Sequence, residues 1–230
     1  MPEIQLNDFF KFYSDSVEQK EATQLLQSAM PESLLKNSSA WVTKFREQPE
    51  VPDVENPLDV KYFWQQDNGP EGWRQCQTSS IAMCLNYLKV EGIEDDVDYP
   101  QVVKRYGDTT LQSSHQQALK FLGVPARFRT DGSKQDLINR IDAGFPAAIG
   151  VLHHSHVSQP SGGGHYICLI GYTDIHAICH DPFGELNLVN GTWQAQGEQD
   201  GNCVKYSWKN LLPRWDLNNG VKDGWWWELG

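Results

Sequence analysis

Apolar residues recur at helical spacing in the first part of the chain. Asp15 and Glu18 have the spacing of a helix capping box, and apolar positions follow at steps of three and four. A second, interrupted apolar face comes next, and the proline-containing stretch 47–53 then breaks the pattern. We therefore predict an N-terminal helical extension over residues 1–50 and one further domain over residues 51–230.

Four more helices are predicted after this break. One begins at Cys76, directly after a polar loop, and is closed by Gly92. Another opens on Ser133 and Asp136, which again have capping-box spacing, and is closed by Gly144. The predicted helices span residues 76–92, 100–107, 111–122 and 133–144.

Runs rich in β-branched and aromatic residues predict strands. A short strand is expected over residues 58–64, and the later strands over 146–152, 165–172, 175–180, 185–189 and 204–208. The connection through Thr173 and Asp174 is too short for a crossover, so the strands on either side of it are expected to pair antiparallel. Helices followed by an antiparallel sheet define the α+β class.

Composition excludes several classes of protein. A hydrophobic share of 39% that includes nine Trp indicates a packed core and excludes a disordered chain. No apolar run reaches the roughly 18 residues of a membrane span, and the first residues lack the features of a signal peptide, so we expect neither membrane insertion nor conventional export. The net charge of -11 repels phosphate backbones, so nucleic acid is not an expected partner.

The five cysteines are an odd number without C-x-x-C spacing, which favours neither a disulfide framework nor a zinc ribbon. Cys76 differs from the others because it lies among polar residues at the start of a predicted helix. There the backbone N–H groups and the helix dipole stabilise a thiolate. The cysteines inside apolar helix or strand patterns are expected in the core: Cys84, Cys168 and Cys179.

A cysteine nucleophile needs a base, and His165 is the best placed of the seven histidines. It follows a glycine run, residues 162–164, and begins a predicted strand. Asp181 closes the neighbouring predicted strand, so an antiparallel hairpin would return it to the vicinity of His165. Its carboxylate could orient the imidazole.

These residues belong to motifs that resemble the peptidase C39-like branch of the papain-like cysteine peptidases. The resemblance covers about residues 57–215 and extends to bacteriophage and cyanobacterial members that are grouped with cell-wall-lytic enzymes. It rests on four segments in the family's order: Gln65-Gln66-Asp67-Asn68, Cys76-Gln77-Thr78-Ser79-Ser80-Ile81-Ala82-Met83, Gly163-Gly164-His165-Tyr166 and His180-Asp181-Pro182-Phe183-Gly184-Glu185.

The resemblance implies a papain-like fold with a helical half and an antiparallel sheet. It implies that Cys76 is the nucleophile, His165 the general base and acid, Asp181 the orienting carboxylate and Gln65 the oxyanion-hole donor. No metal or cofactor is required by this chemistry. Two other glutamines remain alternatives for the oxyanion role, Gln66 and Gln75, and Gln77 stands where the family commonly has glycine.

The activity implied is hydrolysis of amide bonds by a cysteine endopeptidase. The expected substrate is a peptide or muropeptide, as for a phage endolysin or another cell-wall hydrolase. Without a signal peptide, the protein is expected in the cytoplasm of the producing cell or in a phage virion, acting at the wall after release. The alternatives are a γ-glutamyl transpeptidase of the phytochelatin-synthase kind and a non-catalytic virion or binding module on the same scaffold.

Other segments suggest competing sites. The histidines in 153–156 could share a metal ion, although we favour a solvated active-site flap. The acidic run 94–98 could bind calcium but is more typical of a solvated charge run. Tryptophans near the C-terminus could stack on sugars, although packing is the preferred interpretation. Cys168 and Cys179 are expected to face each other across two strands as thiols.

Overall fold

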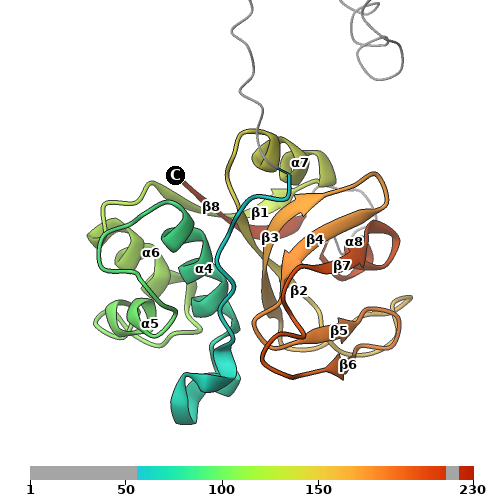
Figure 1. Ribbon diagram of the computed structural model, residues 1–230, viewed down its shortest axis with the longest axis horizontal. Coiled ribbons are helices and arrows are strands. Elements are labelled where there is room, and N and C mark those ends of the chain that lie inside the picture. The colour runs from blue at the N-terminus through green and yellow to red at the C-terminus, as the bar shows by residue number, and fades with distance from the viewer. Residues whose placement is uncertain (1–55, 216–222) are drawn as a thin grey trace, which may run out of the picture. The chain divides into compact units, whose positions relative to one another are not determined.

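The computed structural model describes residues 56–215 and 223–230 (Figure 1). The predicted N-terminal extension over residues 1–50 lies outside the described residues, and the division into two domains stays a prediction. The α-helices are α4 (Cys76–Tyr87), α5 (Asp98–Val103), α6 (Gln112–Phe121), α7 (Lys134–Asp142) and α8 (Trp208–Trp215), and the 3-10 helices are η1 (Gln65–Asp67) and η2 (Gly69–Arg74). None of the described helices is long and apolar enough to cross a bilayer.

Antiparallel pairing builds a six-stranded sheet in the order β1-β8-β2-β3-β4-β7, and β5 and β6 form a separate two-stranded hairpin. The larger sheet contains β1 (Ala126–Gly132), β2 (Ala147–Val151), β3 (His165–Tyr172), β4 (His176–His180), β7 (Val204–Ser207) and β8 (Gly224–Leu229), and the hairpin contains β5 (Glu185–Asn187) and β6 (Thr192–Ala195). The mixture of helices with an antiparallel sheet confirms the predicted α+β class.

The helices pack around the centre of the sheet. Figure 1 shows α4, α5 and α6 together on one side of it and α8 on the other. Helix α4 packs against β2 and β3, whose residues are buried on both faces, so Ile81, Met83 and Leu85 have no solvent exposure. Burial of this kind contributes roughly 25 cal/mol per Å² of apolar surface. It holds the start of α4 in a fixed relation to the sheet.

Local sequence explains where these elements begin. In α7 the Ser133 side chain accepts from the Asp136 N–H, and the Asp136 carboxylate accepts from the Ser133 N–H, which is the predicted capping box. Gly123 and Gly144 follow the C-caps of α6 and α7 in the left-handed backbone region, as predicted. The predicted closure of α4 by Gly92 is wrong, because this helix ends at Tyr87 and Lys89 takes the left-handed position, with a φ of 57°. The helices predicted at 76–92, 100–107, 111–122 and 133–144 are therefore present, with α4 ending earlier and α5 beginning earlier than expected.

Several elements differ from prediction. The expected strand over residues 58–64 is wrong: the segment has no regular secondary structure, although the Leu58 N–H donates to the Ile170 carbonyl of β3. Leu58, Val60 and Phe63 are buried without strand pairing. Six elements were not predicted from the sequence: η1, η2, β1, β6, α8 and β8. Because β1 lies between α6 and α7 in the chain, the helices do not all precede the sheet.

The predicted pairing of Cys168 with Cys179 is also wrong. A register shift between Leu169 and Gly171 places Cys179 opposite Leu169, and Cys168 opposite His180. A connection of only Thr173 and Asp174 would place Tyr172 opposite Ile175, but Tyr172 pairs with Ala177, and the shift at the bulge makes up only part of this difference. The thiol nearest to Cys168 belongs instead to Cys84 of α4, at an Sγ–Sγ distance of 3.6 Å.

Two further expectations were tested by burial. Trp226 and Trp227 are almost fully buried in β8, which favours packing over a sugar-stacking surface. The acidic run 94–98 is not simply solvated, because Asp96 is 2% exposed and accepts hydrogen bonds from Ser79 and Asn68. Burial raises the pKa of Asp96 to about 6 even though these bonds favour its charged form.

Candidate active site

Cys76 is the first residue of α4 and is partly exposed, whereas the next nine residues of the helix are buried. Gln75 occupies the N-cap position but makes no side-chain capping bond. The backbone N–H groups of the first helical turn are therefore not taken up by a capping side chain. They can favour negative charge at the Cys76 thiol or on an oxygen bound beside it.

His165 and Asp181 lie together on the sheet next to this helix end. His165 begins β3, Asp181 directly follows β4, and the antiparallel pairing of the two strands brings the side chains into contact. His165 Nε2 donates to Asp181 Oδ1 at 2.7 Å, and both side chains are buried. The other ring nitrogen, Nδ1, is left for a second partner.

The pKa values of Cys76 and His165 are shifted in opposite directions. Burial alone would raise the pKa of the Cys76 thiol, but interaction with His165 and with the Tyr166 backbone N–H lowers it below its ordinary value. Burial alone would lower the pKa of His165, but the Asp181 carboxylate and Cys76 raise it to about 10. The two shifts favour a thiolate beside an imidazolium at neutral pH.

Aromatic rings enclose the imidazole. Trp193 of β6 meets His165 edge-on, with ring centroids 5.0 Å apart, and Phe183 packs on Trp193 at 4.6 Å. His153 lies 6.0 Å from His165 on another side. Such an apolar wall limits the access of water to the His165–Asp181 bond and strengthens it.

Gln65 is fully buried in η1, and both its backbone and its side chain are held by hydrogen bonds. Its backbone N–H donates to the carbonyl of Pro182, the residue after Asp181, at 3.0 Å. Its side-chain Nε2 donates to the Gly72 carbonyl at 2.6 Å, which uses one of its two N–H groups. A Cβ at Gly72 would lie 2.3 Å from the Gln65 carbonyl oxygen, so glycine permits this close approach.

The alternative glutamines have different surroundings. Gln75 is 5% exposed and its side-chain oxygen has no hydrogen-bond partner, while Gln66 is half-buried. Gln77 is also buried, and its amide donates to Gln112, whose own amide donates to the Tyr166 hydroxyl. The residue that replaces the family's usual glycine thus joins α4 to α6 and to β3.

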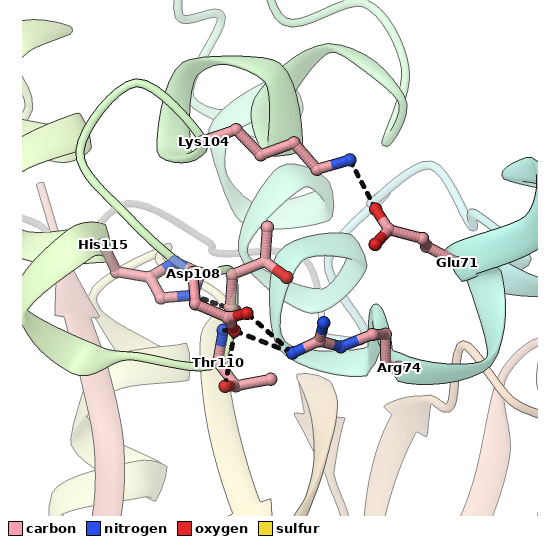
Figure 2. A network of polar contacts seen from close by, with 7 residues as sticks. Glu71, Arg74, Lys104, Asp108, Thr110 and His115 are labelled. Atoms are coloured by element: carbon pink, nitrogen blue, oxygen red, sulfur yellow. Dashed lines mark hydrogen bonds and ion pairs between the residues drawn. The ribbon is translucent and has the colours of Figure 1, made fainter.

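Ion pairs fasten the loop before Cys76 to the segments around α5 and α6 (Figure 2). Arg74 donates to both oxygens of Asp108, at 2.7 and 3.0 Å, and Lys104 pairs with Glu71 at 2.6 Å. Hydrogen bonds from Thr110, together with Arg74, lower the pKa of Asp108 to about 2. Both bonds to Asp108 come from one guanidinium nitrogen of Arg74, and together with the Lys104–Glu71 pair they link the residues that lead into α4 to the neighbouring helices.

The histidines in 153–156, considered above as metal ligands, are not arranged around a common metal position. His153 and His154 stack on each other at 4.0 Å, while His156 bonds Ser158. Among the described residues, no group of three or more His, Cys, Asp or Glu is placed to hold a metal ion. The segment 153–156 instead borders the site through the His153 ring.

Sequence reasoning missed the residues that surround the three central side chains. Trp193 belongs to the unpredicted strand β6, and Tyr206 of β7 donates to Asp181 Oδ2 at 2.8 Å. Alternation of buried and exposed positions in β7 places Tyr206 inside, a pattern visible in its sequence. Its hydroxyl partner, by contrast, depends on the tertiary fold.

A family model, the Peptidase_C39 like family, matches residues 57–210. The chain belongs to this family. This C39-like protein is a cysteine peptidase, and the matched residues include Cys76, His165 and Asp181. None of the curated proteins matches the chain significantly.

Solved structures similar to this peptidase include a putative C39-like peptidase from Bacillus anthracis. It is 16% identical, with 76% of this chain and 98% of the other covered and a TM-score of 0.49. Another is the peptidase domain of Streptococcus ComA, a bi-functional ABC transporter involved in a quorum-sensing pathway. It is 15% identical, with 69% and 92% covered and a TM-score of 0.46.

Proposed function

We propose that this peptidase hydrolyses amide bonds through a Cys76-His165-Asp181 triad. The observation that carries the proposal is the bond of His165 Nε2 to Asp181 Oδ1, 2.7 Å long and buried, which leaves the opposite ring nitrogen for Cys76. The lowered pKa of Cys76 and the raised pKa of His165 support the same assignment. A non-catalytic module would not need this pairing.

In the first half of the reaction the Cys76 thiolate attacks the carbonyl carbon, and the electron pair of the C=O bond moves to oxygen. The Gln65 amide and the Cys76 backbone N–H would stabilise that oxyanion, each contributing about 3 kcal/mol in comparable sites. When the C–N bond breaks, His165 gives its proton to the leaving amine. An acyl-enzyme thioester and a free amine result.

In the second half, water attacks the thioester. Neutral His165 takes a proton from the water, the new tetrahedral oxyanion collapses, and Cys76 leaves as a thiolate. The acid product departs and the thiolate–imidazolium pair is restored. Asp181 keeps the imidazole oriented throughout and stays ionised.

We further propose that the substrate is a peptidoglycan stem peptide or a related muropeptide. The residues before His165 support a slim substrate: Gly163 carries no side chain, and Gly162 has a φ of 111°, which disfavours any residue with a Cβ. A chain with small side chains can therefore approach the imidazole closely. The net charge of -11 is compatible with a stem that carries a free amine.

The test is incubation with purified peptidoglycan, followed by mass spectrometry of the released fragments. Cleavage within or next to the stem, absent in Cys76→Ala, is the expected result. Initial rates on muropeptides, casein and glutathione should be compared in the same buffer. Faster casein hydrolysis would replace the muropeptide assignment with a general protease, and peptide-bond formation on glutathione would replace it with the transpeptidase.

A further inference from the structure

Tyr206 has a buried hydroxyl whose bonds are fully accounted for. The phenol oxygen donates to Asp181 Oδ2 at 2.8 Å, and the Leu186 backbone N–H donates to the phenol oxygen at 2.8 Å. A phenol has one proton, and the Leu186 N–H can only donate. The Tyr206 proton is therefore directed at the Asp181 carboxylate.

The Asp181 carboxylate depends on protein donors because it has no solvent exposure. Oδ1 accepts from His165 Nε2 and from the Phe183 backbone N–H, at 2.7 and 3.1 Å. Oδ2 accepts from Tyr206. Rotation of the carboxyl group would break these bonds. Because the group has no contact with solvent, bulk water could not replace them.

The same hydroxyl also fixes the hairpin that covers His165. Leu186, which donates to Tyr206, lies opposite Trp193 in the β5–β6 register. The Trp193 ring lies edge-on to His165 at a centroid distance of 5.0 Å. Tyr206 thus connects the Asp181 carboxylate with β5, the partner of the strand that carries Trp193.

From this geometry we propose that Tyr206 is a positioning residue for the catalytic pair, acting through Asp181 and, by way of Leu186, through Trp193. The proposal rests on the proposed function, in which Cys76 and His165 carry out the reaction. Tyr206 does not touch substrate. Its hydroxyl holds the Asp181 carboxylate in the orientation that favours imidazolium at His165 and so favours thiolate at Cys76.

The test measures the alkylation rate of Cys76 by iodoacetamide as a function of pH, which needs no substrate. In Tyr206→Phe the Asp181 carboxylate loses the bond that fixes its orientation, so it no longer lies in line with His165 Nε2, and the imidazolium and the thiolate are both less favoured. We expect the acid limb of the alkylation profile to move up by about one pH unit, with about a tenfold lower rate on that limb. Turnover should fall in kcat and change little in KM.

Two tyrosines serve as matched controls. Tyr99 is equally buried and donates to His115 Nδ1 at 3.0 Å, away from the site, so Tyr99→Phe should leave the acid limb in place. Tyr62 donates to the backbone carbonyl of Asp181 at 3.1 Å and not to its carboxylate. A shift in Tyr62→Phe as large as that in Tyr206→Phe would overturn the assignment to the carboxylate.

A double-mutant cycle separates positioning from a general loss of stability. On an Asp181→Asn background the phenol has lost its anionic acceptor, so adding Tyr206→Phe should have little further effect on the acid limb. Additive effects of the two substitutions would overturn the proposal. An unchanged acid limb in folded Tyr206→Phe would overturn it too.

A measurement on the wild-type protein covers the case in which Tyr206→Phe does not fold. The Tyr206 ¹³Cζ resonance should shift over the same pH range as Cys76 alkylation, whereas that of Tyr99 should not. A Tyr206 resonance that stays constant over that range would refute the inference. The proposed function fails separately, if wild-type Cys76 is not selectively alkylated at all.

Discussion

The sulfur atoms of Cys84 and Cys168 lie 3.6 Å apart where α4 packs on β3. Cys84 belongs to the helix that begins with Cys76, and Cys168 belongs to the strand that begins with His165. Both thiols are inaccessible to solvent. Sliding of the helix along the strand would open a cavity at this contact, so packing here fixes the separation of nucleophile and base.

The burial pattern predicts selective labelling of thiols. Cys76 should react fastest with iodoacetamide near neutral pH because its pKa is lowered. Cys203 is exposed, but partial burial raises the pKa of its thiol, so it should react slowly. Three cysteines should react only after unfolding: Cys84, Cys168 and Cys179.

Peptide mapping by mass spectrometry after timed labelling checks this order. The matched control is Cys203→Ser, which should leave the fast phase unchanged, whereas Cys76→Ala should abolish it. Faster labelling of Cys203 than of Cys76 would remove the basis for the nucleophile assignment.

The opposed pKa shifts predict a broad pH range of activity. Alkylation of Cys76 should rise through a pKa below that of an ordinary thiol, because His165 is already protonated in this range and its positive charge stabilises the thiolate that forms when Cys76 loses its proton to solvent. Turnover should then remain level and fall as the pH rises through about 10, where His165 loses the proton that the leaving amine requires. Initial rates of alkylation and of hydrolysis over a pH series measure the two limits. A single rise near the pKa of a free thiol would contradict the ion pair.

Local features predicted where three candidate residues lie better than they predicted the sheet. Cys76 begins a helix as expected, and the predicted hairpin brings His165 and Asp181 into contact, while their catalytic roles stay a prediction. The strand β8 was missed because consecutive tryptophans do not alternate in polarity, and its partners in the sheet, β1 and β2, lie far away in the sequence. Long-range pairing of this kind leaves no local pattern.

The register of paired strands is a second feature that the local sequence pattern could not predict. The hairpin between β3 and β4 was predicted, yet its register is shifted: Tyr172 pairs with Ala177 and not with Ile175, and Cys179 lies opposite Leu169. The same shift determines which residues of β4 face the site. Gly171, at the edge of the bulge, lies close to the segment before η1, since a Cβ there would be 2.6 Å from the Asn56 side-chain oxygen.

Gln65→Ala should lower kcat by roughly a hundredfold to a thousandfold with little change in KM, because an oxyanion donor acts mainly in the transition state. The measurement is the steady-state rate at which the fragment is released, as a function of the concentration of peptidoglycan. Gln66→Ala is the matched control, since Gln66 is adjacent and only half-buried. If Gln66→Ala or Gln75→Ala produces the loss and folded Gln65→Ala does not, the oxyanion role belongs to that other glutamine.

Chelation should leave activity intact, because the proposed mechanism uses no metal. His153 is kept neutral by burial and by the neighbouring His165, which lower its pKa to about 4, and its ring packs against the site. Hydrolysis rates before and after EDTA treatment and buffer exchange check this expectation. Loss of activity on chelation, restored by zinc and abolished in His154→Gln, would revive the metal site in residues 153–156.

The last prediction concerns Arg214, a fully buried cation in α8 that donates to four backbone carbonyls. Three acceptors lie in the segment that follows β2, and the fourth is Leu188. The acceptors in that segment are Leu152, His154 and Ser155, at distances between 2.6 and 3.1 Å. Arg214 therefore holds the backbone on both sides of His153, whose ring lies next to His165.

Replacing Arg214 with Met keeps much of the aliphatic volume but leaves these carbonyls without donors. Since one unsatisfied buried group costs roughly 1–3 kcal/mol, the free energy of unfolding should fall by about 3 kcal/mol or more. Turnover of the folded fraction should also fall, because the segment that places His153 against His165 loses its support. Urea denaturation and active-site titration measure the two effects, with the exposed Arg127→Met as the matched control. If Arg214→Met is as stable and as active as Arg127→Met, the backbone around His153 is held by other contacts.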